Sequence, residues 1–174
     1  ANVICHIPDL IDLIKTIDKL LSKDGVFVFE EPYLGSMFKK TSYDQIYDEH
    51  IFMFSGTSVQ QIFDLFDMEL IDLIKQETHG GSMRYVISRK KQRVTNSNVQ
   101  KILDEEKSNN LDNIESCLIF KKNCEDSRIE LNNTINKLIS EGKRIVGYAA
   151  TSKSTTILNY CKIGPEMIEY ICDT

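Results

Sequence analysis

ANVICHIPDLIDLIKTIDKLLSKDGVFVF, residues 1–29, is the stretch that decides the fold class. Residues 1–4 indicate the end of a strand, and the continuously apolar run 26–29 is typical of a strand buried on both faces. Between them a helix is expected to begin at Pro8 and Asp9, to bury leucines and isoleucines at helical spacing, and to stop at Gly25. This order predicts a right-handed crossover with parallel strands, and therefore an α/β fold. The expected buried stripe of the helix is Leu10, Leu13, Ile14, Ile17, Leu20 and Leu21.

The two strands would end at the same edge of the sheet. We therefore expect Cys5 and His6 to lie near Glu30 and Glu31. In open α/β sheets this edge is where ligands bind. The sequence assigns no role to the two glutamates.

Residues 35–54 form a long connection after the second strand, and such connections usually carry function or cover a site. The connection holds Tyr-Asp-Gln-Ile-Tyr-Asp-Glu-His at positions 43–50. If this stretch is helical, Tyr43, Tyr47 and His50 share one face. An imidazole beside a carboxylate and a phenol can transfer protons, so the connection is the first candidate for chemistry.

The rest of the chain predicts a hairpin and then a second α/β unit. A helix follows residues 55–57, with Thr57 and Gln60 fitting a capping box. The apolar runs 68–74 and 83–88 are separated by a short connection, which favours antiparallel pairing and is the ending of the Rossmann-like methyltransferase fold. After a linker at 89–98, the remaining elements are a long helix over 111–141, a strand at 145–150, a helix to about Cys161 and a strand at 170–173. The long helix is expected to turn Leu111, Ile114, Leu118, Leu131, Ile135, Leu138 and Ile139 inward.

Composition excludes several classes of function. The net charge is −5 and the basic cluster at 89–93 is typical of a solvated linker, so no nucleic-acid partner is expected. No apolar run approaches the ~20 residues of a membrane span, so no membrane partner is expected, and no signal peptide is expected either. The five cysteines show no C-x-x-C pair, which indicates reduced thiols of a cytoplasmic protein and no metal site.

Both ends of the chain lie within expected strands, and there is no initiator methionine. We therefore expect an internal fragment of a longer enzyme, which could carry only part of a site.

Four blocks resemble the S-adenosylmethionine-dependent sugar C-methyltransferases, which act on nucleotide-linked keto-deoxyhexoses. They are residues 1–9, residues 43–50 continuing to Phe54 and Ser55, residues 78–84, and residues 147–153. The resemblance implies the rear half of a class I methyltransferase domain at 1–90. It also implies the N-terminal part of a second Rossmann-like α/β domain at 91–174. The glycine-rich cofactor loop and a zinc-binding N-terminal domain of the family are missing, so the fragment alone is expected to be inactive.

Four residues are candidates for the active site, three of them supported by the same resemblance. His50 is the expected general base, which removes a proton from the carbon beside a ketone so that the enolate can take the methyl group. Glu49 and His6 are implied as active-site residues. Tyr47 could donate its phenol to the enolate oxygen.

The remaining expected contacts are with substrate and cofactor. His79, Gly80, Gly81, Ser82 and Arg84 form a glycine-containing loop suited to close approach of a sugar nucleotide. Lys153 precedes a helix whose N-terminal amides could hold a diphosphate. Asn2 is the expected cofactor contact. The sequence does not indicate the sugar, the nucleotide, methylation at C3 or C5, or the oligomeric state.

Two alternatives stay open. Gly147-x-Ala149-x-x-Ser152, with an acidic strand end at Asp173, is a degraded dinucleotide fingerprint, which would suit an NAD(P)-dependent oxidoreductase. A non-catalytic module that binds nucleotide sugars is the other alternative.

Overall fold

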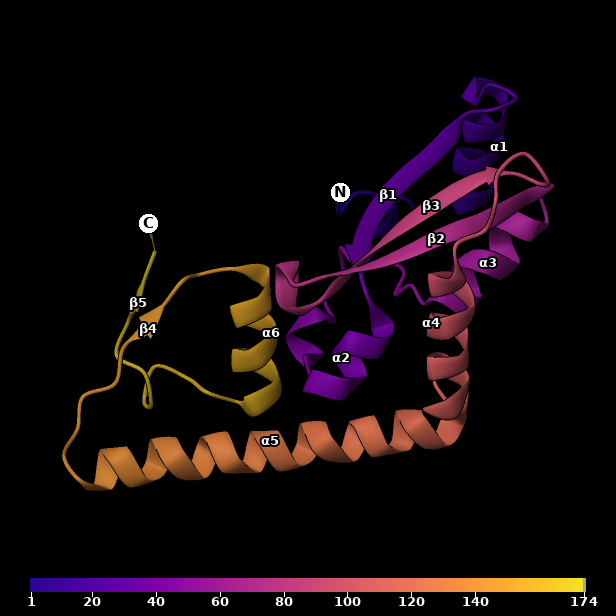
Figure 1. The fold of residues 1–174 in the computed structure, drawn as a ribbon. Helices are drawn as coiled ribbons and strands as arrows, with labels where there is room; N and C mark the ends of the chain where they lie inside the picture. The colour runs from indigo at the N-terminus through magenta and orange to yellow at the C-terminus, as the bar shows by residue number, and fades with distance from the viewer. Residues whose placement is uncertain (174) are drawn as a thin grey trace. The chain divides into compact units, whose positions relative to one another are not determined.

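The computed structural model describes residues 1–173 and shows an α/β protein (Figure 1). The chain divides into two compact units. Unit 1 comprises Ala1–Lys40 and Glu49–Ser116, and unit 2 comprises Thr41–Asp48 and the chain from Cys117 onward. The expected second domain ends at Thr174, which lies outside the described residues. The helices are η1 (Ile4–His6), α1 (Leu10–Leu20), α2 (Leu34–Lys40), η2 (Tyr43–Gln45), α3 (Gly56–Asp64), η3 (Thr78–Gly80), α4 (Ser97–Ser108), α5 (Ile114–Ser140) and α6 (Ser152–Cys161). The strands are β1 (Val26–Pro32), β2 (Met68–Gln76), β3 (Ser82–Arg89), β4 (Gly147–Tyr148) and β5 (Ile171–Cys172).

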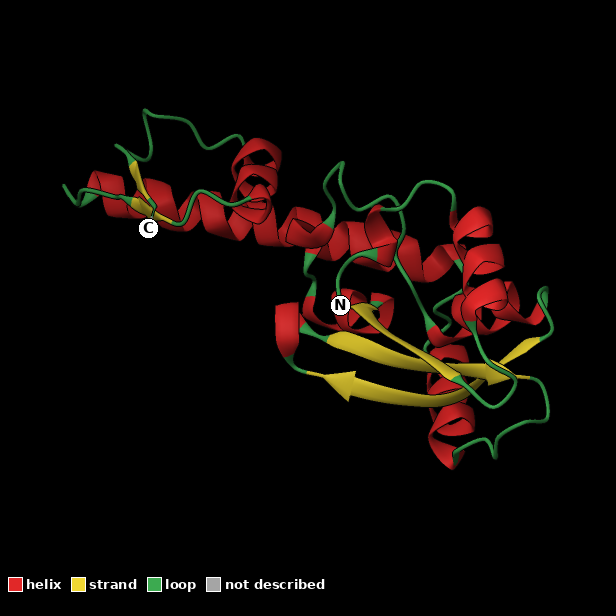
Figure 2. Cartoon of the chain, turned by 90° about the horizontal axis from the view of Figure 1, so that it is seen from above, coloured by secondary structure: helices red, strands yellow, loops and turns green. Residues whose placement is uncertain are grey.

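Unit 1 contains a three-stranded sheet in the order β1-β3-β2, whose strands lie side by side in Figure 2. Strand β3 pairs antiparallel with both neighbours. The antiparallel hairpin predicted for β2 and β3 is therefore confirmed. A bulge between Leu70 and Asp72 lets Leu70 and Ile71 both be buried.

One face of the sheet carries the core of unit 1. Phe29 and Tyr85 are opposite each other on β1 and β3 and stack with their ring centroids 4.8 Å apart. The other face of β1 is open, because Val26 and Val28 are 43% and 49% exposed. The prediction of a strand buried on both faces is therefore wrong for this chain, since the core packs against only one side of the alternating pattern.

Helix α1 begins as expected, because the Asp9 side chain accepts the N–H of Asp12. Leu10, Ile14 and Ile17 are buried in the core. Leu20 was expected in the same buried stripe, but it is the last residue of the helix and its side chain is 81% exposed.

The capping box of α3 was assigned to the wrong residues. Ser55 and Ser58 form it, each side chain bonding the other's backbone N–H. Thr57 instead donates its hydroxyl to Glu106 of α4.

The strand expected over residues 1–4 is also wrong, since this segment leads into the 3-10 helix η1. The N–H groups of Val3 and Ile4 donate to the Glu31 side chain at 2.9 and 2.7 Å, so they form no ladder with a strand. Instead of the expected parallel pairing with β1, the segment makes one backbone hydrogen bond to it, from Asn2 N to Glu30 O at 2.7 Å. These bonds nevertheless confirm that the opening segment lies beside Glu30 and Glu31.

The helix considered for residues 43–50 does not form. Only Tyr43–Gln45 are helical, as the short 3-10 helix η2, and residues 46–50 have no helical structure. Tyr43, Tyr47 and His50 therefore do not share a helix face.

Unit 2 contains most of α5 and a small parallel pair, β4 with β5, joined through α6. This confirms the predicted strand–helix–strand unit. The long helix predicted over 111–141 is confirmed as α5, which begins three residues later, at Ile114, whereas α4 was not predicted. Ile114 and Leu118 are 69% and 58% exposed instead of inward, whereas Ile135 is buried. Within residues 1–173 no helix is both long and apolar enough to cross a bilayer.

Candidate active site

Two histidines that are far apart in the sequence meet in unit 1. The carbonyl of Cys5 accepts the N–H groups of Ile51 and Phe52, at 2.9 and 3.3 Å, and so fixes residues 49–52 beside η1. The ring centroids of His6 and His50 are 5.0 Å apart, at an interplanar angle of 53°. The structure thus brings together three of the four predicted catalytic residues: His6, Glu49 and His50.

His6 is oriented by the backbone of the same motif. Its Nδ1 lies 2.7 Å from the carbonyl oxygen of Glu49. A carbonyl can only accept, so Nδ1 carries the proton and Nε2 presents its lone pair when the ring is neutral. Glu49 contributes its carbonyl to this contact, and its side chain is exposed.

Two buried neighbours of the histidines were not predicted as site residues. Cys5 is 1% exposed and Glu31 is fully buried. Burial raises the pKa of the Cys5 thiol to about 12, and the negative charge and hydrogen-bonding of Glu31 add to the effect. Cys5 therefore stays a thiol at neutral pH and is no nucleophile. The adjacency of Cys5 to His6 was the one signal in the sequence that could have singled it out.

Asn2 is the part of the expected cofactor site that this chain contains. Its side-chain Oδ1 is buried and has no hydrogen-bond partner among residues 1–173. Its backbone φ is 54°, in the left-handed region that asparagine tolerates. An unsatisfied buried acceptor fits an amine donor of a bound cofactor, as S-adenosylmethionine would supply.

A cluster of polar side chains on β1 and β3 lies beside the loop that is expected to contact the substrate. Glu30 and Arg84 are opposite each other in the strand register and form an ion pair of 3.0 Å. Thr78 donates to the other oxygen of Glu30 at 2.9 Å. The Thr78 bond first, and then the bond and charge of Arg84, lower the pKa of Glu30. Arg84 is thus held in place by a protein carboxylate.

The glycines of this loop have conformational reasons for being there. His79 and Gly80 have positive φ, and Gly81 has a φ of 127°. A Cβ on Gly81 would lie 2.5 Å from the Cβ of Ser36, so α2 and the loop could not pack as they do. Lys40 of α2 donates to the Gly80 carbonyl at 2.7 Å, and the buried Ser82 donates to the Thr78 carbonyl at 3.1 Å. His79 is exposed.

Tyr47 and Lys153 belong to unit 2. The segment with Tyr47 is held there by Tyr43, whose hydroxyl lies 3.5 Å from Cys161 Sγ and whose ring lies 5.1 Å from that of Tyr160. Burial and the Cys161 contact raise the pKa of Tyr43 to about 12. Lys153 lies in the first turn of α6.

The N-terminus of α6 is closed by its own capping box. Thr151 and Ser154 bond each other's backbone N–H groups. Of the N-terminal amides expected to bind a diphosphate, that of Ser154 is therefore already engaged.

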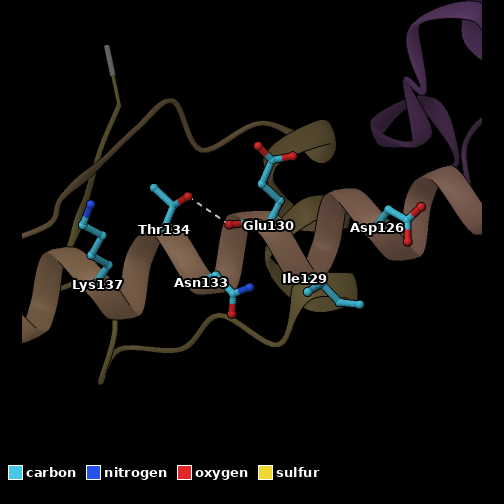
Figure 3. Close-up of a pocket in the computed structure, with 6 residues that line it drawn as sticks. All are labelled: Asp126, Ile129, Glu130, Asn133, Thr134 and Lys137. Carbon is cyan, nitrogen blue, oxygen red and sulfur yellow. Dashed lines mark hydrogen bonds between the residues drawn. The ribbon is translucent and has the colours of Figure 1, made fainter.

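The hollows of unit 2 contain none of the predicted catalytic residues. One of about 370 Å³ lies along α5, and Figure 3 shows that all of its lining side chains come from this single helix. The Thr134 hydroxyl donates to the Glu130 carbonyl within it. A second hollow, of about 220 Å³, is mainly apolar and is lined by residues of β4, α6, β5 and the adjoining loops, including Gly147, Ala149 and Leu158.

Two histidines and a buried carboxylate lie beside the end of a strand in this α/β chain. Such an arrangement is typical of an enzyme active site. Residues 77–174, more than half of the chain, match the family model of the C-methyltransferase C-terminal domain, and residues 1–73 match that of a methyltransferase domain. The chain belongs to this C-methyltransferase family, which confirms the resemblance seen in the sequence. It is 28% identical over 170 residues to the C-methyltransferase NovU of Streptomyces niveus. The match covers 97% of this chain and 40% of that relative, so the chain spans about two fifths of the relative's length.

Proposed function

We propose that the protein containing this chain transfers a methyl group from S-adenosylmethionine to a ring carbon, C3 or C5, beside the keto group of a nucleotide-linked deoxysugar. The observation that carries the proposal is the meeting of His6, Glu49 and His50 at the carbonyl of Cys5. Residues 1–90 would form the rear half of its methyltransferase domain, and residues 91–174 the N-terminal part of its C-terminal α/β domain.

His50 is proposed as the general base. The C–H bond beside the ketone breaks, its proton goes to an imidazole nitrogen of His50, and the electron pair forms an enolate on the sugar. The enolate carbon would then form the new C–C bond to the methyl group that S-adenosylmethionine supplies, while the S–CH₃ bond breaks and its electron pair stays on the sulfur of the departing thioether. A lost general base typically slows a reaction by ~10²–10⁴-fold.

The other residues of the motif position this step. The Glu49 carbonyl fixes the Nδ1–H of His6, so that Nε2 of His6 can accept a hydrogen bond from a sugar hydroxyl. The Glu49 side chain, which is exposed, is proposed to contact the sugar. Tyr47 is proposed to donate its phenol to the enolate oxygen.

Asn2 would hold part of the cofactor through its unsatisfied Oδ1. When bound, S-adenosylmethionine supplies an electrophilic methyl group. The proposed methyl transfer uses no zinc, and a zinc-binding N-terminal domain is proposed only for the whole protein.

The substrate contacts are proposed along the two loops found from the sequence. His79 and Gly80 are exposed at a loop that Lys40 and Ser82 hold in shape. Gly81 lets this loop pack closely on α2, and Arg84 supplies a positive charge, which the Glu30 pair orients. Lys153 is proposed to bind the diphosphate as a point charge.

The test is the His50→Asn variant of the whole protein. We expect methyl transfer to slow by roughly 10²–10⁴-fold, with S-adenosylmethionine binding unchanged in calorimetry. Exchange of the substrate's C–H proton with deuterated water, followed by NMR, reports proton removal separately from methyl transfer and should slow in parallel. Asp48→Asn, an exposed change two residues away, is the matched control and should retain both rates.

An unchanged exchange rate in His50→Asn would refute the base assignment. A methyl group found on a sugar oxygen or nitrogen would refute the enolate mechanism. The two alternatives are separated by thermal shift and assay: an oxidoreductase would be stabilised by NAD(P), and a non-catalytic module would bind the nucleotide sugar without turnover.

A further inference from the structure

Cys5, His6 and His50 bring a sulfur and two imidazoles to one place in unit 1. One potential ligand atom from each residue lies within 4.8 Å of the others. The geometry points to a binding site for a thiophilic divalent transition-metal ion, of which Zn²⁺ is the type, formed by these three side chains. Neither the spacing of the cysteines nor the proposed methyl transfer implies this site.

The ligand set suits such an ion. A thiolate and two imidazoles are the softer ligands that select zinc over magnesium or calcium. In a tetrahedral zinc site, bond lengths of ~2.0–2.3 Å place ligand atoms roughly 3.4–3.7 Å apart. The three ligand atoms now lie within 4.8 Å of one another, so the most widely separated of them must move about 1 Å closer when the ion binds. His50 lies in a segment without regular structure, where such a movement breaks no helix or strand.

His6 already has the arrangement that metal-bound histidines show. Metal-ligating imidazoles commonly donate their second ring N–H to a carbonyl or carboxylate, which fixes the tautomer and the ring orientation. The His6 Nδ1 makes this contact with the Glu49 carbonyl at 2.7 Å. The lone pair of Nε2 is then available to the ion.

Glu31 provides an independent indication of a missing ligand. This residue is fully buried, and its Oε1 accepts the N–H groups of Val3 and Ile4. Its Oε2 is buried without a hydrogen-bond partner of regular geometry among residues 1–173, and the carboxylate interacts with the Cys5 thiol, whose proton leaves when the metal binds. A water molecule in the fourth position of the ion would give this oxygen the donor that it lacks.

Binding of the metal ion displaces the proton of the Cys5 thiol. The Cys5 S–H bond breaks, the S–metal bond forms, and the proton leaves to water. Where His50 acts as the general base, the bound ion takes the lone pair that would accept the substrate proton. Methyl transfer is then inhibited by zinc; this consequence alone depends on the proposed function.

The test measures metal binding directly in this chain and needs no enzymatic activity. Co²⁺ is added to the reduced, metal-free protein, and the near-ultraviolet charge-transfer absorption of a cobalt–thiolate bond is recorded. We expect one Co²⁺ per chain with this absorption, and its loss when Zn²⁺ displaces the cobalt. Cys5→Ser should abolish the absorption, and His6→Asn and His50→Asn should each weaken Co²⁺ binding by at least about tenfold.

Two control variants keep the result specific. Cys117→Ser removes an exposed thiol elsewhere, and His79→Asn removes the histidine outside the cluster; both should bind Co²⁺ like the parent. Since Cys5 is buried, circular dichroism checks that Cys5→Ser is folded. If Cys5→Ser is unfolded, the Co²⁺ affinity of His6→Asn tests the site instead, because His6 is partly exposed and its substitution is less disruptive. Absence of the absorption in the parent, its persistence in Cys5→Ser, or unchanged affinity in His6→Asn would each overturn the site, whatever the outcome of the methyl-transfer assay.

Discussion

Gly81 is the residue at which the backbone leaves least freedom. Its φ of 127° disfavours any side chain, and a Cβ would lie 2.5 Å from Ser36 Cβ. Gly81→Ala should lower the free energy of unfolding by about 3 kcal/mol, combining backbone strain with a forced shift of α2. Urea unfolding measures the change.

Gly142 offers the matched control for this substitution. It also has a positive φ, 73°, but a Cβ there would meet no atom within 4 Å. Gly142→Ala should cost only about 1 kcal/mol. In a Ser36→Gly background the clash at Gly81 is removed, so the added cost of Gly81→Ala should fall toward the strain alone. Equal costs at both glycines would contradict the role assigned to Ser36.

Single residues of the candidate site could be predicted where their chemistry is local to a motif. His50 and Glu49 stand in one eight-residue stretch, and His6 follows an expected strand end. Cys5 and Glu31 were expected at the same edge of the sheet as His6, but not as site residues, because their importance comes from burial and from contacts distant in sequence, such as that between Ile4 and Glu31. Apolar periodicity does not show which carboxyl group will be buried.

The element that most depends on another is α3. Its N-terminus is bonded by Glu106 of α4, which is 3% exposed and accepts Gly56 N, Thr57 N and the Thr57 hydroxyl at 2.6, 2.9 and 2.6 Å. Tyr33 adds its hydroxyl at 3.0 Å. Glu106→Ala leaves these buried donors unpaired, so we expect a loss of about 3 kcal/mol or more in the free energy of unfolding.

Glu105→Ala is the control beside it on the same helix. The Glu105 side chain is 43% exposed and pairs with Lys75 at 2.7 Å, so its removal should cost less than about 1 kcal/mol. Guanidinium unfolding of both variants gives the comparison. A loss at Glu106 no larger than that at Glu105 would show that α3 does not need this contact.

The elements that the sequence predicted correctly are those with complete local signals. The β2–β3 hairpin has two apolar runs and a short connection, and α1 has a capping aspartate. The expected strand at residues 1–4 failed because a side chain, Glu31, takes the N–H groups that a strand would offer to a neighbour. The helix considered for residues 43–50 is absent beyond Gln45, and Tyr43 instead packs on α6, more than a hundred residues away in the sequence.

At the scale of the whole molecule, both units contain buried apolar residues among the residues described. Ile87 is fully buried in the cluster of unit 1, and Ile135 is 6% exposed on the part of α5 in unit 2. Apolar residues buried in two compact units favour separate unfolding of the units, in which a single two-state transition no longer describes the chain. Since the sequence connects the units at several points, its linear order alone could not have assigned residues 41–48 to unit 2.

The same substitution at one buried isoleucine of each unit tests this independence. Ile87→Val and Ile135→Val each remove one methylene, at a cost of about 0.5–1.5 kcal/mol. We expect urea unfolding, followed by hydrogen exchange with mass spectrometry, to show two transitions. Ile87→Val should shift only the transition reported by peptides of β1, β2 and β3, and Ile135→Val only that reported by α5 and α6. If either variant shifts both transitions equally, the two units unfold as one cooperative body, and their separation is structural without thermodynamic independence.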